Sequence, residues 1–302
     1  MALLSGSASV SRYSVVPVVE DPGFERAGFR EILPGSEVRE AAGFVPLEPE
    51  APYSAGHARW FFRVRIDTLR ADPTAVKERV KELVRVEIEQ GMGFVGPKKR
   101  KKLKELAEEE LIVQSRPRTK IVEGCLDGAT LWIGSTAKSV IGKVLEQLRR
   151  IGVSAEPRTP WLERGDPEID DAVVETHEPG ESVLGCRFLE ALIEDREILF
   201  EPETGMVRLR TEDARITLSG AILPDLHRYI DRDARLLSAK LITGESTFRF
   251  DALPFRVSAL RVDTEKHEHW TEQLDERLEK IAAVYDLLDR KYTEHAPRLL
   301  KA

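Results

Sequence analysis

The sequence predicts an α+β protein in which mixed or antiparallel sheets are flanked by helices. Three observations lead to this class: an alternating apolar run near residue 60, a strand–strand–helix–strand order over residues 119–157, and three consecutive strand-like runs over residues 234–263. Such an order of strands and helices is that of an α+β unit.

Two strands are predicted within the first seventy residues. Ser9–Val19 is rich in β-branched residues, which favour strands. From residue 59 to residue 67 the side chains alternate, which predicts a half-buried strand with a basic outer face. The apolar face holds Trp60, Phe62, Val64 and Ile66, and the other face holds Arg59, Phe61, Arg63, Arg65 and Asp67.

A helical hairpin is predicted over about residues 72–112. Asp72 is a good N-cap, Pro73 suits the first helical position, and apolar residues recur at helical spacing as far as Ile88. Glycines at 91 and 93 end this helix, and Gly96-Pro97 starts a second one that continues to about Ile112.

The remainder divides into an α+β segment, an acidic segment and a second α+β region. We expect strands on both sides of Asp127-Gly128, an amphipathic helix over Thr136–Gly152, and an acidic linker over residues 161–180. This gives an N-terminal region 1–160 and a C-terminal region 181–302. The second region is expected to hold a helix near 181–194, strands near 196–200 and 205–209, a short helix near 224–230, three strands, and a final helix over about 270–292. The apolar seam of that final helix either packs on the core or mediates dimerisation.

Composition places the chain among cytoplasmic proteins. Its 302 residues are 41% hydrophobic, and no apolar run approaches the roughly 20 residues of a membrane span. The start lacks a secretory signal pattern. Cys125 and Cys186 stand far apart, which indicates reduced thiols. The net charge is −7, yet residues 59–150 hold 21 Lys and Arg against 13 Asp and Glu.

No motif of known chemistry is present. The phosphate-binding loop, the dinucleotide glycine pattern and the nucleophile elbow are all missing from the sequence. His267–His269 and the acidic cluster over residues 163–171 are interpreted as surface segments. We therefore expect no catalytic residues, no cofactor and no metal site. A metal-dependent DNA exonuclease remains an alternative, because carboxylates from distant parts of the chain can converge.

The stretch from Lys98 to Lys104 holds six cations in seven residues and is the strongest candidate site. The cations stand at a helix N-terminus and the glutamates at its C-terminal end, an order that opposes the helix dipole. An anionic partner would relieve this repulsion. Lysine meets phosphates as a point charge and no aromatic residue interleaves the run, so we expect a sequence-independent contact with a phosphate backbone. The predicted DNA-binding residues are Lys98, Lys99, Arg100, Lys101, Lys102, Lys104, Arg116, Arg118 and Lys120.

The order of several motifs resembles the bacterial recombination-associated RdgC family. They are Arg12-Tyr13, "GFVP" at 43–46, the Lys-rich "KKRKKLKELAEEEL", Pro117-Arg118, "LWIGSTA", "VLEQLRRIGVSAEP" and "RLLSAKLITGESTFRFDALPFRVSALRVD". The family's tryptophan in the second motif is Phe44 here, and its small-plus-aromatic pair after Pro-Arg is Thr119-Lys120.

The resemblance implies a multi-domain horseshoe and a ring-shaped homodimer that encircles double-stranded DNA without sequence preference. It also implies a nucleoid-associated protein that restrains RecA-type recombinases in homologous recombination. No membrane partner is expected, because no apolar run is long enough for a membrane span. The alternatives are the exonuclease and a protein-interaction scaffold that does not bind DNA.

Overall fold

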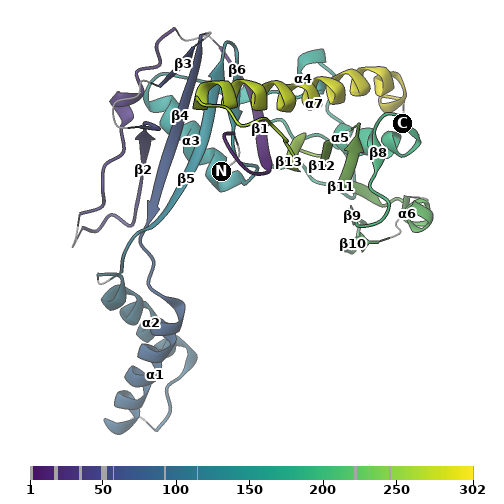
Figure 1. Ribbon diagram of the computed structural model, residues 1–302. Coiled ribbons are helices and arrows are strands. Elements are labelled where there is room, and N and C mark those ends of the chain that lie inside the picture. Colours follow the sequence, from purple (N-terminus) through teal and green to yellow (C-terminus); the bar gives the residue numbers. More distant parts are fainter. Residues whose placement is uncertain are drawn as a thin grey trace. The chain divides into compact units, whose positions relative to one another are not determined.

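The computed structural model confirms the α+β class (Figure 1). It describes residues 3–16, 20–33, 36–48, 53–56, 58–91, 93–113, 115–220, 223–230, 232–244 and 246–301. Its main feature is a large antiparallel sheet with flanking helices, and the sheet does not close into a barrel.

The elements follow the chain in a simple order. The strands are β1 (Ala8–Val15), β2 (Glu40–Val45), β3 (Ser54–Gly56), β4 (Arg59–Thr68), β5 (Arg118–Asp127), β6 (Thr130–Ile133), β7 (Ala155–Pro157), β8 (Leu199–Phe200), β9 (Met206–Arg210), β10 (Arg215–Ser219), β11 (Arg235–Thr243), β12 (Ser246–Asp251) and β13 (Arg256–Leu260). The helices are α1 (Pro73–Glu89), α2 (Pro97–Ile112), α3 (Lys138–Arg150), α4 (Pro160–Arg164), α5 (Val183–Ala191), α6 (Leu223–Ile230) and α7 (Trp270–Leu299), with short 3-10 turns at Phe24–Ala27 and Leu192–Glu194.

The strand order joins both ends of the chain in one sheet. It reads β10-β9-β11-β12-β13-β1-β6-β5-β4-β2, with β3 on β4, β7 on β1 and β8 on β11. Strand β1 is central, because it pairs with β13 through Val10 opposite Val257 and with β6 through Arg12 opposite Trp132. The predicted first strand ends at Val15, and residues 17–19 of that prediction lie outside the described residues.

The chain divides into two compact units. The large unit comprises residues 1–24, 46–63 and 122–302, and the small unit comprises residues 25–45 and 64–121, including the hairpin of α1 and α2. Compactness does not establish independent folding. The predicted domain boundary at 161–180 and the horseshoe arrangement therefore stay predictions.

Helix α7 packs its apolar seam into the core of the large unit. The seam residues Leu274, Leu278, Ile281, Tyr285, Leu288 and Tyr292 are all buried. The Tyr285 hydroxyl donates to the Val10 carbonyl at 2.7 Å and accepts from the Val257 N–H at 3.2 Å, which links the helix to β1 and β13. Of the two uses predicted for the seam, the structure shows core packing within the chain.

Helix α7 is also longer than the sequence indicated. It continues past Tyr292 to Leu299 and includes Pro297 near its end. Buried Ala296 and Leu299 anchor this last part, and Arg187 donates to the Leu299 carbonyl at 2.8 Å. A proline there loses one backbone hydrogen bond, and the packing of its neighbours offsets that loss.

The acidic segment contains structure that the sequence reading missed. Its short helix α4 places Trp161 in the core, where the indole N–H donates to the Gly180 carbonyl at 3.1 Å. The ring meets Phe255 edge-on at 5.4 Å between centroids. Asp171 forms an ion pair with Arg235 at 2.8 Å. The acidic cluster is therefore partly engaged in internal contacts.

The outer face of β4 is more covered than predicted. Phe61 is buried and contacts the Trp270 ring at 5.5 Å between centroids. Arg59 pairs with Asp127 at 3.0 Å and with Asp275 at 2.7 Å. These contacts show that Arg59 neutralises acids of the same unit, so this end of β4 offers no phosphate-binding surface.

Candidate nucleic-acid interface

The first helix of the hairpin starts where its capping residues predict. Asp72 adopts an extended backbone, and its carboxylate accepts from the Thr74 N–H at 2.8 Å and from the Ala75 N–H at 3.0 Å. These backbone hydrogen bonds lower the pKa of Asp72. Pro73 follows at the first helical position, where a missing N–H costs nothing.

The two helices lie side by side as an antiparallel hairpin (Figure 1). Val76 of α1 and Leu103 and Ala107 of α2 are buried. Ion pairs tie the helices together at both ends: Arg79 contacts Glu110 at 2.8 Å, and Lys99 contacts Glu87 at 2.8 Å. One member of the predicted DNA-binding set, Lys99, is thus engaged in holding the hairpin together.

Helix α2 carries its charges against its own dipole, as the sequence predicted. Gly96 provides no side-chain cap, the first turn contains no acid, and the last turn contains no base. The intrahelical pairs Lys101–Glu105, at 4.0 Å, and Lys104–Glu108, at 3.5 Å, lie at the surface, with side chains 43–80% exposed. Exposed pairs of this type add at most a few tenths of a kcal/mol. They do little to offset the repulsion among the cations.

Three cations near the start of α2 have no acidic partner. Lys98, Arg100 and Lys102 are exposed, and none forms an ion pair with any residue that the structure describes. Helical spacing of three and four residues places such side chains about 5–6 Å apart at their Cβ atoms. The N-terminal half of α2 therefore presents a dense, solvated array of positive charge.

The other predicted residues lie beyond the acidic half of the same helix. Arg116 is in the connection after α2, and Arg118 and Lys120 are at the start of β5, all exposed. A rise of 1.5 Å per residue places the end of α2 about 20 Å from Lys98 along the axis. Glu105, Glu108, Glu109 and Glu110 occupy that interval. The nine residues thus form two groups rather than one continuous patch.

The hairpin also exposes cations that sequence reasoning missed. Lys77 and Lys81 stand one turn apart on α1, and both line a groove together with Arg100, Lys101 and Lys104 of α2. Their i,i+4 spacing is the sequence signal that places both lysines on one face of α1. Packing of the hairpin is what brings the two sets of cations together.

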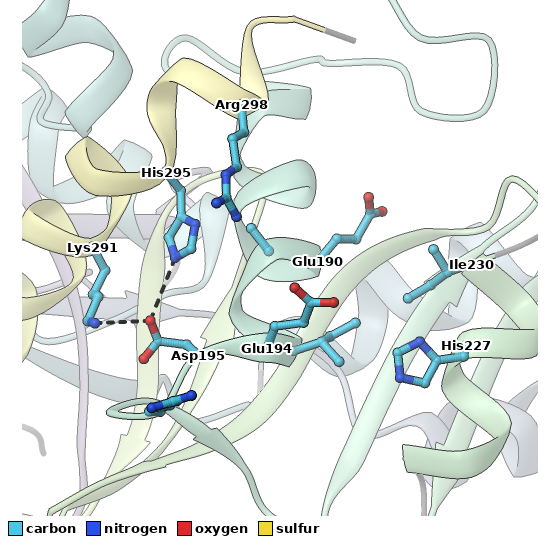
Figure 2. A pocket seen from close by; sticks show the side chains of 11 residues that line it. Glu190, Glu194, Asp195, His227, Ile230, Lys291, His295 and Arg298 are labelled. Carbon is cyan, nitrogen blue, oxygen red and sulfur yellow. Dashed lines mark ion pairs between the residues drawn. The ribbon is translucent and has the colours of Figure 1, made fainter.

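A second cavity, of about 570 Å³, lies in the large unit where α5, α6 and α7 meet. Figure 2 shows Lys291 and His295 pointing toward Asp195, at 3.0 and 3.6 Å. Burial opposes ionisation of Asp195, but hydrogen bonds from the Ile198 and Glu197 N–H groups and from Lys291 outweigh it and lower its pKa to about 2.

The Glu190 carboxyl of the same cavity behaves in the opposite way. Burial raises its pKa, and Arg235 opposes this effect only in part. Two carboxyls with divergent pKa values are a feature of acid–base sites. Here, however, the Asp195 carboxylate accepts hydrogen bonds from Lys291 and from two backbone N–H groups. These contacts fix the connection before β8 to α7. We interpret this network as structural.

Metal-binding and nucleophilic groups do not converge in the described part of the chain. Within it, no group of three or more His, Cys, Asp or Glu side chains is arranged to share a metal ion. His267 contacts Glu276 at 2.6 Å and Glu272 at 3.6 Å. Cys125 and Cys186 are both buried free thiols, and burial raises the pKa of each.

The fold and the site define an α+β protein with an exposed, Lys-rich helical hairpin. The sequence matches no model of a known protein family, and a search of curated proteins gives no significant match. Among the described helices, none has both the length and the apolar character required to cross a lipid bilayer.

Proposed function

We propose that this protein binds double-stranded DNA without sequence preference through the small unit, chiefly through the N-terminal half of α2. By its resemblance to the RdgC family, we further propose that it acts at the nucleoid as a homodimer that modulates homologous recombination and restrains a RecA-type recombinase. The family role rests on the order of the sequence motifs, whereas the contact surface rests on the hairpin.

The observation that carries the proposal is the set of exposed cations without acidic partners at the start of α2. Lys98 and Arg100 lie in the first turn of α2, where the helix dipole adds further positive potential, and Lys102 follows one turn after Lys98. A helix N-terminus with unpaired cations favours an anion, and a row of phosphates supplies several at once. Lysines and an arginine that point to solvent grip the backbone but do not read base edges in a groove.

The test is the salt dependence of binding to two labelled duplexes of unrelated sequence, measured by fluorescence anisotropy. If about six phosphates are contacted, the slope of log K against log salt should be near −5 for both duplexes. The double variant Lys98→Glu with Lys102→Glu should lose binding to both duplexes alike.

A matched control reverses two exposed charges of the large unit, Lys266→Glu with Arg232→Glu, and should bind nearly as well as the wild type. Salt-independent binding, or equal losses in both variants, would refute the proposed interface. In a parallel reaction, the protein is incubated with the labelled duplex and magnesium or manganese, and the strands are then analysed on a denaturing gel. Shortening of the strands would favour the exonuclease instead.

A further inference from the structure

The hairpin carries a groove whose character phosphate binding does not explain. It has a volume of about 630 Å³ and lies between α1 and α2. Its lining combines an apolar set with a cationic set and includes no acidic residue of the described chain. The apolar set is Pro73, Val76, Val80 and Pro97, and the cationic set is Lys77, Lys81, Arg100, Lys101 and Lys104.

We call the apolar set the base of the groove and the cationic set its edges, because long cationic side chains keep their charge in water. Lys77 and Lys81 come from one helix at i,i+4 spacing, and Arg100 and Lys104 come from the other at the same spacing. Long side chains of this kind lay their methylene stems on apolar surface and keep the charge in water. The accessible lining is accordingly mostly apolar although five of its nine residues are cations.

The charges at the edges are available to a ligand. Lys77, Lys81 and Arg100 form no ion pair with any described residue, while Lys101 and Lys104 pair with glutamates of their own helix at the surface, at 4.0 and 3.5 Å. A neighbouring hollow of about 650 Å³ shares Pro73, Val76 and Lys104, and its further lining includes Arg39 and Arg70 together with Glu40 and Glu108.

A phosphate backbone would satisfy the cations but would leave the apolar base exposed to water. An acidic segment with apolar side chains on one face satisfies both, because it buries carbon on Val80 and the prolines and places carboxylates against the edges. Along α1 the groove extends from Pro73 to Lys81, about 12 Å, which is roughly two turns of a docked helix.

We propose that this groove binds an acidic, amphipathic peptide segment of a partner protein. A further consequence rests on the proposed function: since Arg100, Lys101 and Lys104 also belong to the DNA-binding set, the bound peptide competes with duplex DNA. The peptide would thereby regulate the same surface that holds the phosphates.

The probe is a labelled synthetic peptide of about 14 residues, with leucines at i, i+3, i+4 and i+7 and glutamates elsewhere. Binding is measured by anisotropy and compared with a peptide of identical composition in which the leucines are scattered around the helix. We expect the amphipathic peptide to bind clearly more tightly. Equal binding of the scattered peptide would show charge attraction alone and would overturn the proposal.

Two variants with equal charge loss localise the site. Lys77→Gln with Lys81→Gln should lower the affinity for the peptide about ten-fold. Lys98→Gln with Lys102→Gln, outside the groove, should leave this affinity nearly unchanged. Val80→Ser should weaken binding of the peptide but not binding of the duplex. Circular dichroism confirms that each variant keeps its helices.

The outcomes separate this inference from the proposed function. Peptide binding without any duplex binding would refute DNA binding and leave the groove assignment intact. Loss of duplex binding in Val80→Ser would show that the duplex itself covers the apolar part of the groove and would overturn the assignment. A change of molar mass in light scattering for Lys77→Gln with Lys81→Gln, without peptide, would instead identify a second copy of the chain as the occupant.

Discussion

The Lys99 ammonium group contacts the Glu87 carboxylate at 2.8 Å across the hairpin, whereas the adjacent Lys98 has no acidic partner among the described residues. Neighbouring cations in one run therefore have different roles. Lys99 contributes to holding α2 against α1, and Lys98 is free to meet a ligand. This difference allows structural and binding contributions to be separated by mutation.

Removing Lys98 and Lys102 together should weaken duplex binding without destabilising the protein. The double alanine variant loses two phosphate contacts, so the log–log salt slope should become less steep by about two. The melting temperature should stay within error of the wild type, because neither side chain pairs with a described acid. A large fall in melting temperature would show that these lysines support the fold.

Glu87→Gln tests the role of the cross-hairpin ion pair. It breaks the contact with Lys99 while making the small unit more positive, so nonspecific attraction to DNA should rise slightly or stay the same. The helices should separate more often, and amide hydrogen exchange over α1 and α2 should accelerate. The pair is partly exposed, so the cost should be only about 0.5 kcal/mol. Unchanged exchange would mean that the hairpin does not depend on this contact.

A buried ion pair in the large unit should matter far more. Arg12 of β1 donates two hydrogen bonds to Asp289 of α7, at 2.6 and 2.8 Å, and its guanidinium lies 4.8 Å from the Tyr285 ring centroid. Asp289→Asn leaves a buried guanidinium without its counter-charge, which should lower the free energy of unfolding by about 3 kcal/mol. Urea denaturation measures this loss.

The matched control for that experiment is an exposed pair. Glu89→Gln removes the contact with Arg85 at 2.9 Å, where both side chains are mostly solvated, and should change stability by less than about 0.5 kcal/mol. Equal losses in the two variants would contradict the assignment of Arg12 and Asp289 as a core contact.

The sequence predicted the elements whose local signals agree. Asp72 and Pro73 specified the start of α1, Gly96-Pro97 the start of α2, and Gly128, with a φ of +57°, the turn between β5 and β6. In each case the cap or turn chemistry acts over a few residues, so no tertiary information was required.

Features that depend on contacts outside their own segment were not predicted. The residues of strand β10 are exposed or half-buried and so lack a buried apolar face, and the strand is defined by its pairing with β9 through five residues from Arg215 to Ser219. Helix α4 lies largely within the predicted acidic linker, because its buried tryptophan stabilises a helix only once Phe255 and Gly180 are in place. The cationic groove of the hairpin likewise requires two helices to pack, which no single periodicity reveals.

The Asp195 network predicts a specific pH dependence. Its carboxyl has a pKa lowered to about 2 in the folded protein, against an ordinary value near 4 when unfolded. The folded state therefore gains stability from Asp195 at pH values above about 4, and this gain is lost as the pH falls toward 2. Asp195→Asn lacks the titrating group, so it should melt below the wild type at pH 6, and the gap should close between pH 4 and pH 2. Because both proteins share every other acid, their difference isolates this one carboxylate. A gap that stays constant across this range would show that Asp195 contributes only through its neutral hydrogen bonds.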